Sequence, residues 1–336
     1  MKRIAIILVL SFMSMNIVAQ NKLKSTLDYL TEHFTFNGYA HLGWEYGSES
    51  DPNNSFKISR IIVFTDYRIN DHWDAFAMVD FKAFSLHEMW INYKVAPWMQ
   101  WKIGQFKTPF TLENPISPVV MEMITQMSLA GNFMVAGSST LMMPGGAGRD
   151  IGLTVYGDLD EWASYDLAVM NGEGRNRLDG NSWKDFVGRL TFHPIKGLDV
   201  SGSVILGKGS LSNLSLYNGG NGDVKGNYTR NRYSAGFQLK TKPVNLRCEW
   251  MWGKDADLKT NGGYATAQVN NIGVKNLDMV ASYDRLDLGE EEINRYQAGF
   301  QYWFYKMCRI QAAYTYTDIT GVGHEHGVLT QLQVGF

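Results

Sequence analysis

The sequence predicts an all-β protein, a transmembrane antiparallel β-barrel of sixteen strands. Three observations lead to this prediction: a secretory leader, a long-range alternation of apolar and polar side chains, and an aromatic residue that ends the last alternating segment. After residue 19, no stretch approaches ~18 consecutive apolar residues, so no membrane-spanning helix is expected. The exported chain is therefore either soluble or a closed barrel.

Residues 1–19 are predicted to be a signal peptide that is cleaved. Lys2 and Arg3 give a positive start, Ile4–Leu10 is apolar, and small or aliphatic residues precede the cut. The apolar run is too short to cross a ~30 Å hydrocarbon core, which disfavours a membrane anchor. Residues 20–33 would then be a periplasmic tail or a short helix, and the sequence does not choose between them.

The C-terminal segment Val328–Phe336 has the period-2 pattern of a strand between lipid and water. Every second side chain is apolar or a threonine, and Gln331, Gln333 and Gly335 stand between them. A terminal aromatic residue on such a strand resembles the signal by which bacterial outer-membrane barrels are recognised for assembly. We therefore expect residues 34–336 to be an integral barrel in the outer membrane of a Gram-negative bacterium, surrounded by outer-membrane lipid.

The same alternation recurs along the chain and predicts where the strands lie. Between 232 and 240, for example, Tyr233 and Phe237 share one parity, and Arg232 and Gln238 share the other. Residues 56–67 are apolar on both parities, so the facing of Arg60 stays open. The predicted strands are 34–46, 55–67, 73–82, 87–95, 99–106, 150–158, 164–172, 185–193, 198–206, 231–240, 244–253, 263–270, 276–286, 293–304, 308–318 and 327–336.

Two classes of connection alternate between these strands. Short turns, several with Asn-Asp or proline, are expected at the periplasmic side. The other class is mostly longer and rich in Gly and Asn, and includes 107–149, 173–184, 207–230, 254–262 and 319–326. Because sixteen strands make a wide cylinder, we expect a water-filled lumen.

Charge and histidine placement exclude several classes of function. Without the leader, 29 basic residues face 33 acidic ones, a net charge near −4 that argues against nucleic acid as a partner. His41 and His193 have inward parity but lie on well-separated strands, and no histidine belongs to a nucleophile–base constellation, so no enzyme is predicted. The tripeptide 324–326 offers two histidines without a third ligand, so neither a metal nor another cofactor is predicted.

The connection 107–149 is the longest and is unusually rich in methionine. An exposed loop gains nothing from so many apolar side chains. We favour a loop that folds into the lumen and narrows the pore, over an external flap that meets a neighbouring subunit or a partner. The methionines are Met121, Met123, Met127, Met134, Met142 and Met143.

Three segments resemble the phosphate-selective porin O and P family, and they occur in that family's order. They are Gly104–Pro115 (GQFKTPFTLENP), Gly148–Gly152 (GRDIG) and Tyr165–Gly174 (YDLAVMNGEG). The resemblance implies a sixteen-stranded porin barrel, often a homotrimer, with a constriction formed partly by the third outer loop. By matching position, Lys107 and Arg149 would be basic residues at the two roots of that loop. Alternatively, both fix strand register by hydrogen bonding.

Selectivity for anions would require a run of Arg and Lys along the lumen. The inward basic residues are predicted to be Lys82, Lys94, Lys102, Arg189, Arg232, Lys240, Arg247, Arg295 and Arg309. The inward acids are predicted to be Asp74, Asp80, Glu88, Asp166, Asp199, Glu249, Asp278 and Asp284. Because these sets nearly balance, we expect many of their members to pair across the wall.

These observations predict a porin that lets small hydrophilic solutes and ions diffuse passively, with weak selectivity. A preference for anions such as phosphate would arise only at the constriction. The alternative is a plugged structural or adhesive barrel that acts as a partner of surface lipoproteins.

Overall fold

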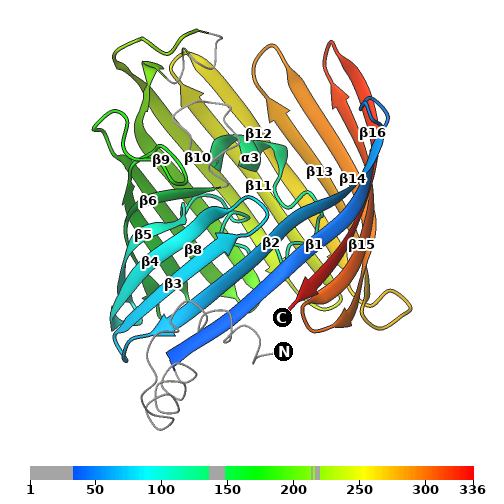
Figure 1. The fold of residues 1–336 in the computed structure, drawn as a ribbon, viewed down its shortest axis with the longest axis horizontal. Coiled ribbons are helices and arrows are strands. Elements are labelled where there is room, and N and C mark those ends of the chain that lie inside the picture. Colours follow the sequence, from blue (N-terminus) through cyan, green and yellow to red (C-terminus); the bar gives the residue numbers. More distant parts are fainter. Residues whose placement is uncertain (1–32, 136–147, 213–214, 216–219) are drawn as a thin grey trace, which may run out of the picture. The chain divides into compact units, whose positions relative to one another are not determined.

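In the computed structural model, sixteen antiparallel strands close into one barrel (Figure 1). The structure describes residues 33–135, 148–212, 215 and 220–336, and the barrel unit is Phe36–Phe336. The predicted signal peptide and residues 20–32 lie outside the described residues. The strands are β1 (Phe34–Gly47), β2 (Asn54–Arg68), β3 (Trp73–Asp80), β4 (Ser85–Ala96), β5 (Met99–Lys107), β6 (Arg149–Leu159), β7 (Ala163–Met170), β8 (Asp185–Ile195), β9 (Leu198–Ser210), β10 (Asn227–Lys240), β11 (Val244–Asp255), β12 (Leu258–Val269), β13 (Leu277–Asp287), β14 (Glu292–Tyr305), β15 (Cys308–Ile319) and β16 (Gly323–Gly335).

The barrel closes where β1 pairs with β16. The paired residues run from Tyr39 with Gly335 to Gly47 with Gly327. At the end of this seam, the backbones of Gly38 and Phe336 exchange two hydrogen bonds of 2.9 Å each. The prediction of a closed sixteen-stranded barrel is confirmed, and the terminal phenylalanine takes part in the closure.

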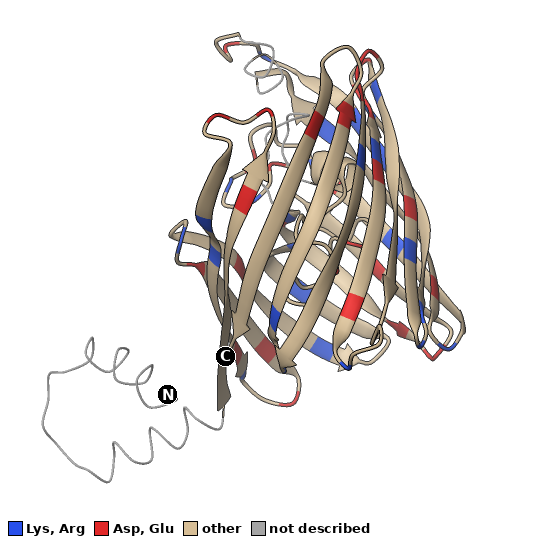
Figure 2. Cartoon of the chain, turned by 90° about the vertical axis from the view of Figure 1, so that its right-hand side faces the viewer, with Lys and Arg blue, Asp and Glu red and all other residues tan. Residues whose placement is uncertain are grey.

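Apolar side chains face outward and polar side chains face the lumen, as the alternation predicts. On β10, Tyr233 and Phe237 are exposed, whereas Arg232, Ser234 and Gln238 are buried. Figure 2 shows charged positions scattered singly along strands that are otherwise uncharged. No helix among the described residues is long and apolar enough to cross a bilayer. An apolar exterior around a polar interior is what a bilayer demands of a membrane-spanning sheet.

Two outer connections are tighter than predicted. The segments 254–262 and 319–326 are mostly strand, because β11–β12 and β15–β16 continue to pair farther outward. Lys254, for example, is paired with Lys259. A strand that extends beyond the bilayer meets water on its outer face and carries polar residues on both parities. Such a stretch has the composition of a loop, which is why the alternation missed it.

A charge placed on the lipid-facing surface should destabilise the barrel according to its depth. Ala298 is exposed near the middle of β14, and Phe304 is exposed near its periplasmic end. We expect Ala298→Arg to lower the free energy of unfolding from vesicles by about 2–4 kcal/mol, and Phe304→Arg by about 1 kcal/mol. Equal losses in urea titrations would contradict the assigned facing and depth.

Candidate functional site

The connection between β5 and β6 folds into the barrel. Its short helix α3 (Leu129–Val135) contacts β11, β12 and β13, and Figure 1 shows it inside the ring of strands. Residues 108–135 hydrogen-bond to lumen-facing side chains of β8–β11 and β14–β16. The wall residues that contact this loop are Arg189, Ser203, Arg232, Arg247, Glu249, Arg295, Gln297, Arg309, Gln311 and Gln333.

Apolar packing explains the methionine content of the loop. Phe110 is completely buried and Met134 is 1% exposed, and both belong to a cluster with wall residues such as Met170 and Met251. Burying one such side chain contributes roughly 1.5–3 kcal/mol. The loop is therefore anchored by hydrophobic contacts as well as by hydrogen bonds. Of the predicted methionines, those at 142–143 lie outside the described residues.

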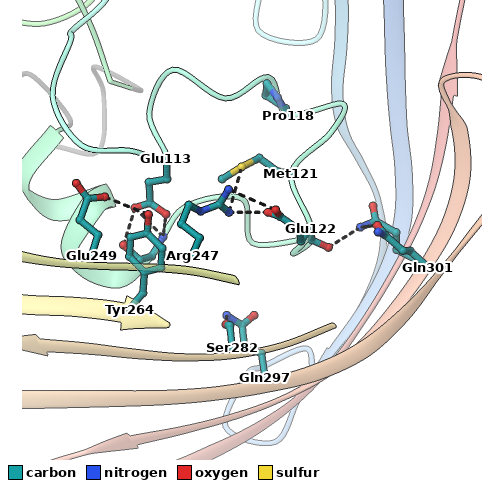
Figure 3. Close-up of polar contacts among 12 residues, drawn as sticks. Glu113, Pro118, Met121, Glu122, Arg247, Glu249, Tyr264, Ser282, Gln297 and Gln301 are labelled. Carbon is teal, nitrogen blue, oxygen red and sulfur yellow. Dashed lines mark hydrogen bonds and ion pairs between the residues drawn. The ribbon is translucent and has the colours of Figure 1, made fainter. Parts of the chain in front are cut away.

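Buried carboxylates fix the loop against β11 and β12 (Figure 3). Both oxygens of Glu249 accept hydrogen bonds from the backbone N–H of Leu112 at 2.9 Å, and the Tyr264 hydroxyl donates to Glu249 at 3.0 Å. Beside them, Arg247 forms an ion pair with Glu122 of the loop at 2.5 Å. Removing one member of such a buried pair leaves an uncompensated charge, which is strongly destabilising.

Glu113 belongs to the same cluster and is 3% exposed. It accepts hydrogen bonds from the Ser128 hydroxyl at 2.6 Å and from the Ser128 backbone N–H at 3.1 Å and 3.2 Å. Burial raises the pKa of Glu113 to about 8, and neighbouring Glu249 adds to the rise, although Ser128 and Arg247 oppose it. The carboxyl group of Glu113, which the loop encloses, is therefore protonated at neutral pH.

Six of the eleven basic residues predicted for the lumen and the loop roots form ion pairs with carboxylates. The pairs are Lys94–Asp74 at 2.5 Å, Arg149–Glu88 at 2.8 Å, Arg189–Asp166 at 2.6 Å, Arg232–Asp255 at 2.7 Å, Arg247–Glu122 at 2.5 Å and Arg295–Asp284 at 2.6 Å. Four of these pairs join neighbouring strands, Arg149–Glu88 joins β6 to β4 across β5, and Arg247–Glu122 joins the wall to the loop. Much of the lumen charge is therefore neutralised locally, as the balanced counts led us to expect.

The other five have different surroundings, and Lys240 is exposed at the last position of β10. Lys102 lies over aromatic rings, and Lys107 donates to the Ile116 carbonyl at 2.7 Å. Arg309 donates to the side chains of Gln301 and Gln333. Lys82 does not lie on a strand facing the lumen, as the sequence predicted, because β3 ends at Asp80. Lys82 lies in an exposed outer turn, where its backbone N–H donates to the Asp80 carboxylate at 2.9 Å.

Sequence reasoning missed two arginines that lie near the roots of the loop. Arg60 has the parity of the buried Ile62 on β2, and Arg175 comes from the outer connection between β7 and β8. Arg60 and Arg149 act electrostatically on both Lys107 and Arg175. We call Arg60, Lys107, Arg149 and Arg175 the basic corner.

The basic corner carries an excess of positive charge. Burial and the nearby Arg149 lower the pKa of Arg175 from its ordinary value. Within the described part of the chain, no carboxylate lies within 4.0 Å of the charged groups of Arg60, Lys107 or Arg175. The parity of Arg60 could have been assigned from the β2–β3 register, but nothing in the sequence placed Arg175 here.

The histidines take part in ordinary hydrogen bonds. His41 contacts Gln333 at 3.1 Å, and His193 contacts Asp199 at 2.7 Å. His326 contacts the Tyr314 hydroxyl at 2.5 Å. Among the residues that the structure describes, no group of three or more His, Cys, Asp or Glu side chains is placed to hold a metal ion.

Comparison with solved structures identifies the architecture. The barrel is similar to an anion-selective porin from Comamonas acidovorans, with a TM-score of 0.65 and 11% identity over 90% of this chain and 99% of that one. It is also similar to OprB of Pseudomonas putida, with a TM-score of 0.66 and 9% identity over 93% and 96% of the two chains. OmpF of Salmonella typhi gives a TM-score of 0.65 and 14% identity over 90% and 97%.

This chain has the porin fold. It is the architecture of integral β-barrels in the Gram-negative outer membrane, as the alternation predicted. At these identities the likeness establishes the fold alone. No family model matches the chain, and no curated protein matches its sequence.

The buried Glu113 should make the attachment of the loop depend on pH. Its pKa of about 8 lies above the ordinary value of 4.5, so the closed loop holds a proton that a detached loop releases. This contribution to closure is complete below pH ~4.5 and is lost as the pH rises through about 8. Hydrogen exchange in residues 108–135, corrected for intrinsic rates, should accelerate over that window.

Glu113→Gln should abolish this pH dependence, because the amide does not titrate. The exposed Glu290→Gln is the matched control and should behave like the wild type. An unchanged pH profile in Glu113→Gln would show that another group controls the loop.

Proposed function

We propose that this protein is an outer-membrane porin for the passive diffusion of small hydrophilic solutes and ions. The observation that carries the proposal is a set of partly exposed ion pairs inside the barrel, beside the loop. The side chains of Asp74, Lys94, Asp166 and Arg189 are 23%, 40%, 22% and 19% exposed. Charged groups keep such exposure only where water reaches them, and a continuous water path through a membrane barrel is a diffusion channel.

The loop is proposed to be the constriction. Among the described residues, 108–135 form no hydrogen bond with side chains of β3, β4 or β7, whereas they bond to most other parts of the wall. The water path would therefore run between the loop and the wall of β2–β7. Membership of the phosphate-selective porin O and P family and assembly as a homotrimer belong to the same proposal. A similar outer-membrane protein of Vibrio cholerae, OmpT, is described in a trimer form.

Removing the loop should widen the pore. We expect replacement of residues 115–145 by a short Gly-Ser linker to raise single-channel conductance in planar bilayers by about twofold or more, because conductance follows the narrowest cross-section. Replacing the outer turn 48–53 is the control and should leave conductance unchanged. Equal conductance in the wild type and the loop deletion would refute the constriction.

The basic corner should make the pore prefer anions slightly. We expect Arg60→Glu to reduce the permeability ratio of chloride to potassium by about twofold, since a fixed charge at a narrow passage concentrates its counter-ion. Lys82→Glu makes the same change of charge on the exposed outer turn and should shift the ratio far less. Reversal potentials in a salt gradient measure both, and equal shifts would exclude the corner as the selectivity element.

A plugged structural barrel is the second candidate, and one contact favours it. Val119 of the loop reaches the wall near the closing seam, where it packs with Tyr39 and Ile62. A loop held that firmly across the lumen could serve as a plug, and the barrel would then present its outer loops to surface lipoproteins. Absence of any single-channel current from correctly folded protein would decide for this candidate.

A further inference from the structure

His193 belongs to a hydrogen-bonded series with a serine and an aspartate on the lumen wall. The Ser164 hydroxyl lies 3.4 Å from Nε2 of His193, and Nδ1 of His193 lies 2.7 Å from Oδ1 of Asp199. Ser164, His193 and Asp199 stand on the neighbouring strands β7, β8 and β9. A hydroxyl, an imidazole and a carboxylate in this order, with one imidazole nitrogen toward each oxygen, form the triad of a serine hydrolase.

Strand register brings these three residues together. Thr191 on β8 pairs with Ser164 on one side and with Ser201 on the other. Because side chains on one face of a strand recur at every second position, two steps along β8 and two steps back along β9 lead to His193 and Asp199. Ser164 comes from the preceding hairpin, so nothing in the sequence indicated that it meets the other two.

A fourth side chain fixes the carboxylate. Nε2 of Gln238 on β10 donates to Oδ2 of Asp199 at 3.0 Å, which leaves Oδ1 to accept from His193. Since a carboxylate only accepts hydrogen bonds, Nδ1 of His193 carries the proton, and Nε2 accepts from the Ser164 hydroxyl. Within the described part of the chain, that hydroxyl has no other hydrogen-bond partner. The imidazole is therefore placed to take the hydroxyl proton.

The triad is open to water at the periplasmic mouth of the lumen. Ser164 is the second residue of β7, and His193 and Asp199 flank the turn that joins β8 to β9. The side chains of His193 and Asp199 are 33% and 28% exposed. Among the described residues, 108–135 form no hydrogen bond with any of the three. His41, by contrast, is completely buried and contacts amide side chains.

We propose that this triad hydrolyses small carboxylic esters at the periplasmic mouth of the barrel. Oγ of Ser164 attacks the ester carbonyl carbon while Nε2 of His193 takes the hydroxyl proton, and Asp199 holds the charged imidazole in place. His193 then gives this proton to the leaving oxygen, so the alcohol departs as its C–O bond breaks and the acyl group stays on Ser164. Water attacks the acyl carbon, again with His193 as the base. The carboxylic acid leaves and the Ser164 hydroxyl is restored.

The neighbours of Ser164 define the class of ester. Asp158 on β6 and Thr191 on β8 are its direct partners in register. Because the Cβ atoms of such partners lie about 4.5–5.5 Å apart, the two side chains flank the Ser164 hydroxyl and favour a small acyl group such as acetyl. The Asp158 carboxylate repels an anionic acyl group, whereas the Thr191 hydroxyl and lumen water would solvate the negative oxygen of the tetrahedral intermediate. The expected substrates are neutral, water-soluble acetate esters.

A fluorophosphonate reagent tests the activation of Ser164 in the folded, detergent-solubilised protein. Its phosphorus bonds to the oxygen of an activated serine as fluoride leaves and the proton passes to the base, and peptide mass spectrometry shows which serine carries the label. We expect the wild type to be labelled at Ser164 and to hydrolyse p-nitrophenyl acetate faster than heat-denatured protein does. A folded wild type without label at Ser164 would overturn the proposal, whether or not the barrel conducts ions.

Ser164→Ala should abolish the label and reduce ester hydrolysis to the rate of the denatured protein. Ser201→Ala is the matched control, because the Ser201 hydroxyl faces the lumen on β9 but contacts Thr191 and the Leu190 carbonyl instead of an imidazole. It should leave labelling and hydrolysis unchanged. Equal hydrolysis in the wild type and Ser164→Ala would show that Ser164 is not the nucleophile.

Asp199→Asn tests the positioning role of the carboxylate. The amide keeps the size of the side chain but does not hold the imidazole in the required tautomer, so kcat should fall by about a hundredfold or more while KM stays close to that of the wild type. Heat-modifiable migration in gels checks that each variant is folded. An unchanged kcat in the folded variant would exclude Asp199 from the reaction and with it the triad.

Discussion

The structure depends on the need to pair every backbone N–H and C=O group that lies in hydrocarbon. An unpaired group there costs several kcal/mol, and an open sheet has two unpaired edges. The chain meets this constraint by closing β1 on β16, down to the hydrogen bonds between Gly38 and Phe336. Closure fixes the alternation of side chains, because each strand must present one face to lipid and the other to the lumen.

A wide lumen creates the opposite problem, because its polar wall must be hydrated or paired. On β8–β11 and β14–β16 the wall side chains bond to the loop 108–135, which covers buried ion pairs such as Arg247–Glu122. The ion pairs Asp74–Lys94 on β3–β4 and Asp166–Arg189 on β7–β8 keep partial exposure. The barrel thus has an anchoring side and a side that contacts water. The basic corner belongs to the second side.

The basic corner is the proposed selectivity element for small ions. The excess positive charge of the basic corner favours anions through a field that salt screens over roughly 10 Å. The methionines of the loop 108–135 help it to pack on the inner wall, since flexible thioether side chains fill irregular spaces.

The sequence by itself determined the number of strands, the facing of most of their side chains and the location of the long connection between β5 and β6. Period-2 alternation is a local property of each strand, and Val328–Phe336 displays it without any partner. Only the tertiary structure decided which charges pair, because Arg149–Glu88 and Arg247–Glu122 join segments far apart in the chain. It also brought Arg175 to Arg60 and assembled Phe64, Phe76 and Trp90 into a row. Such contacts follow from strand register and tilt, which no single strand encodes.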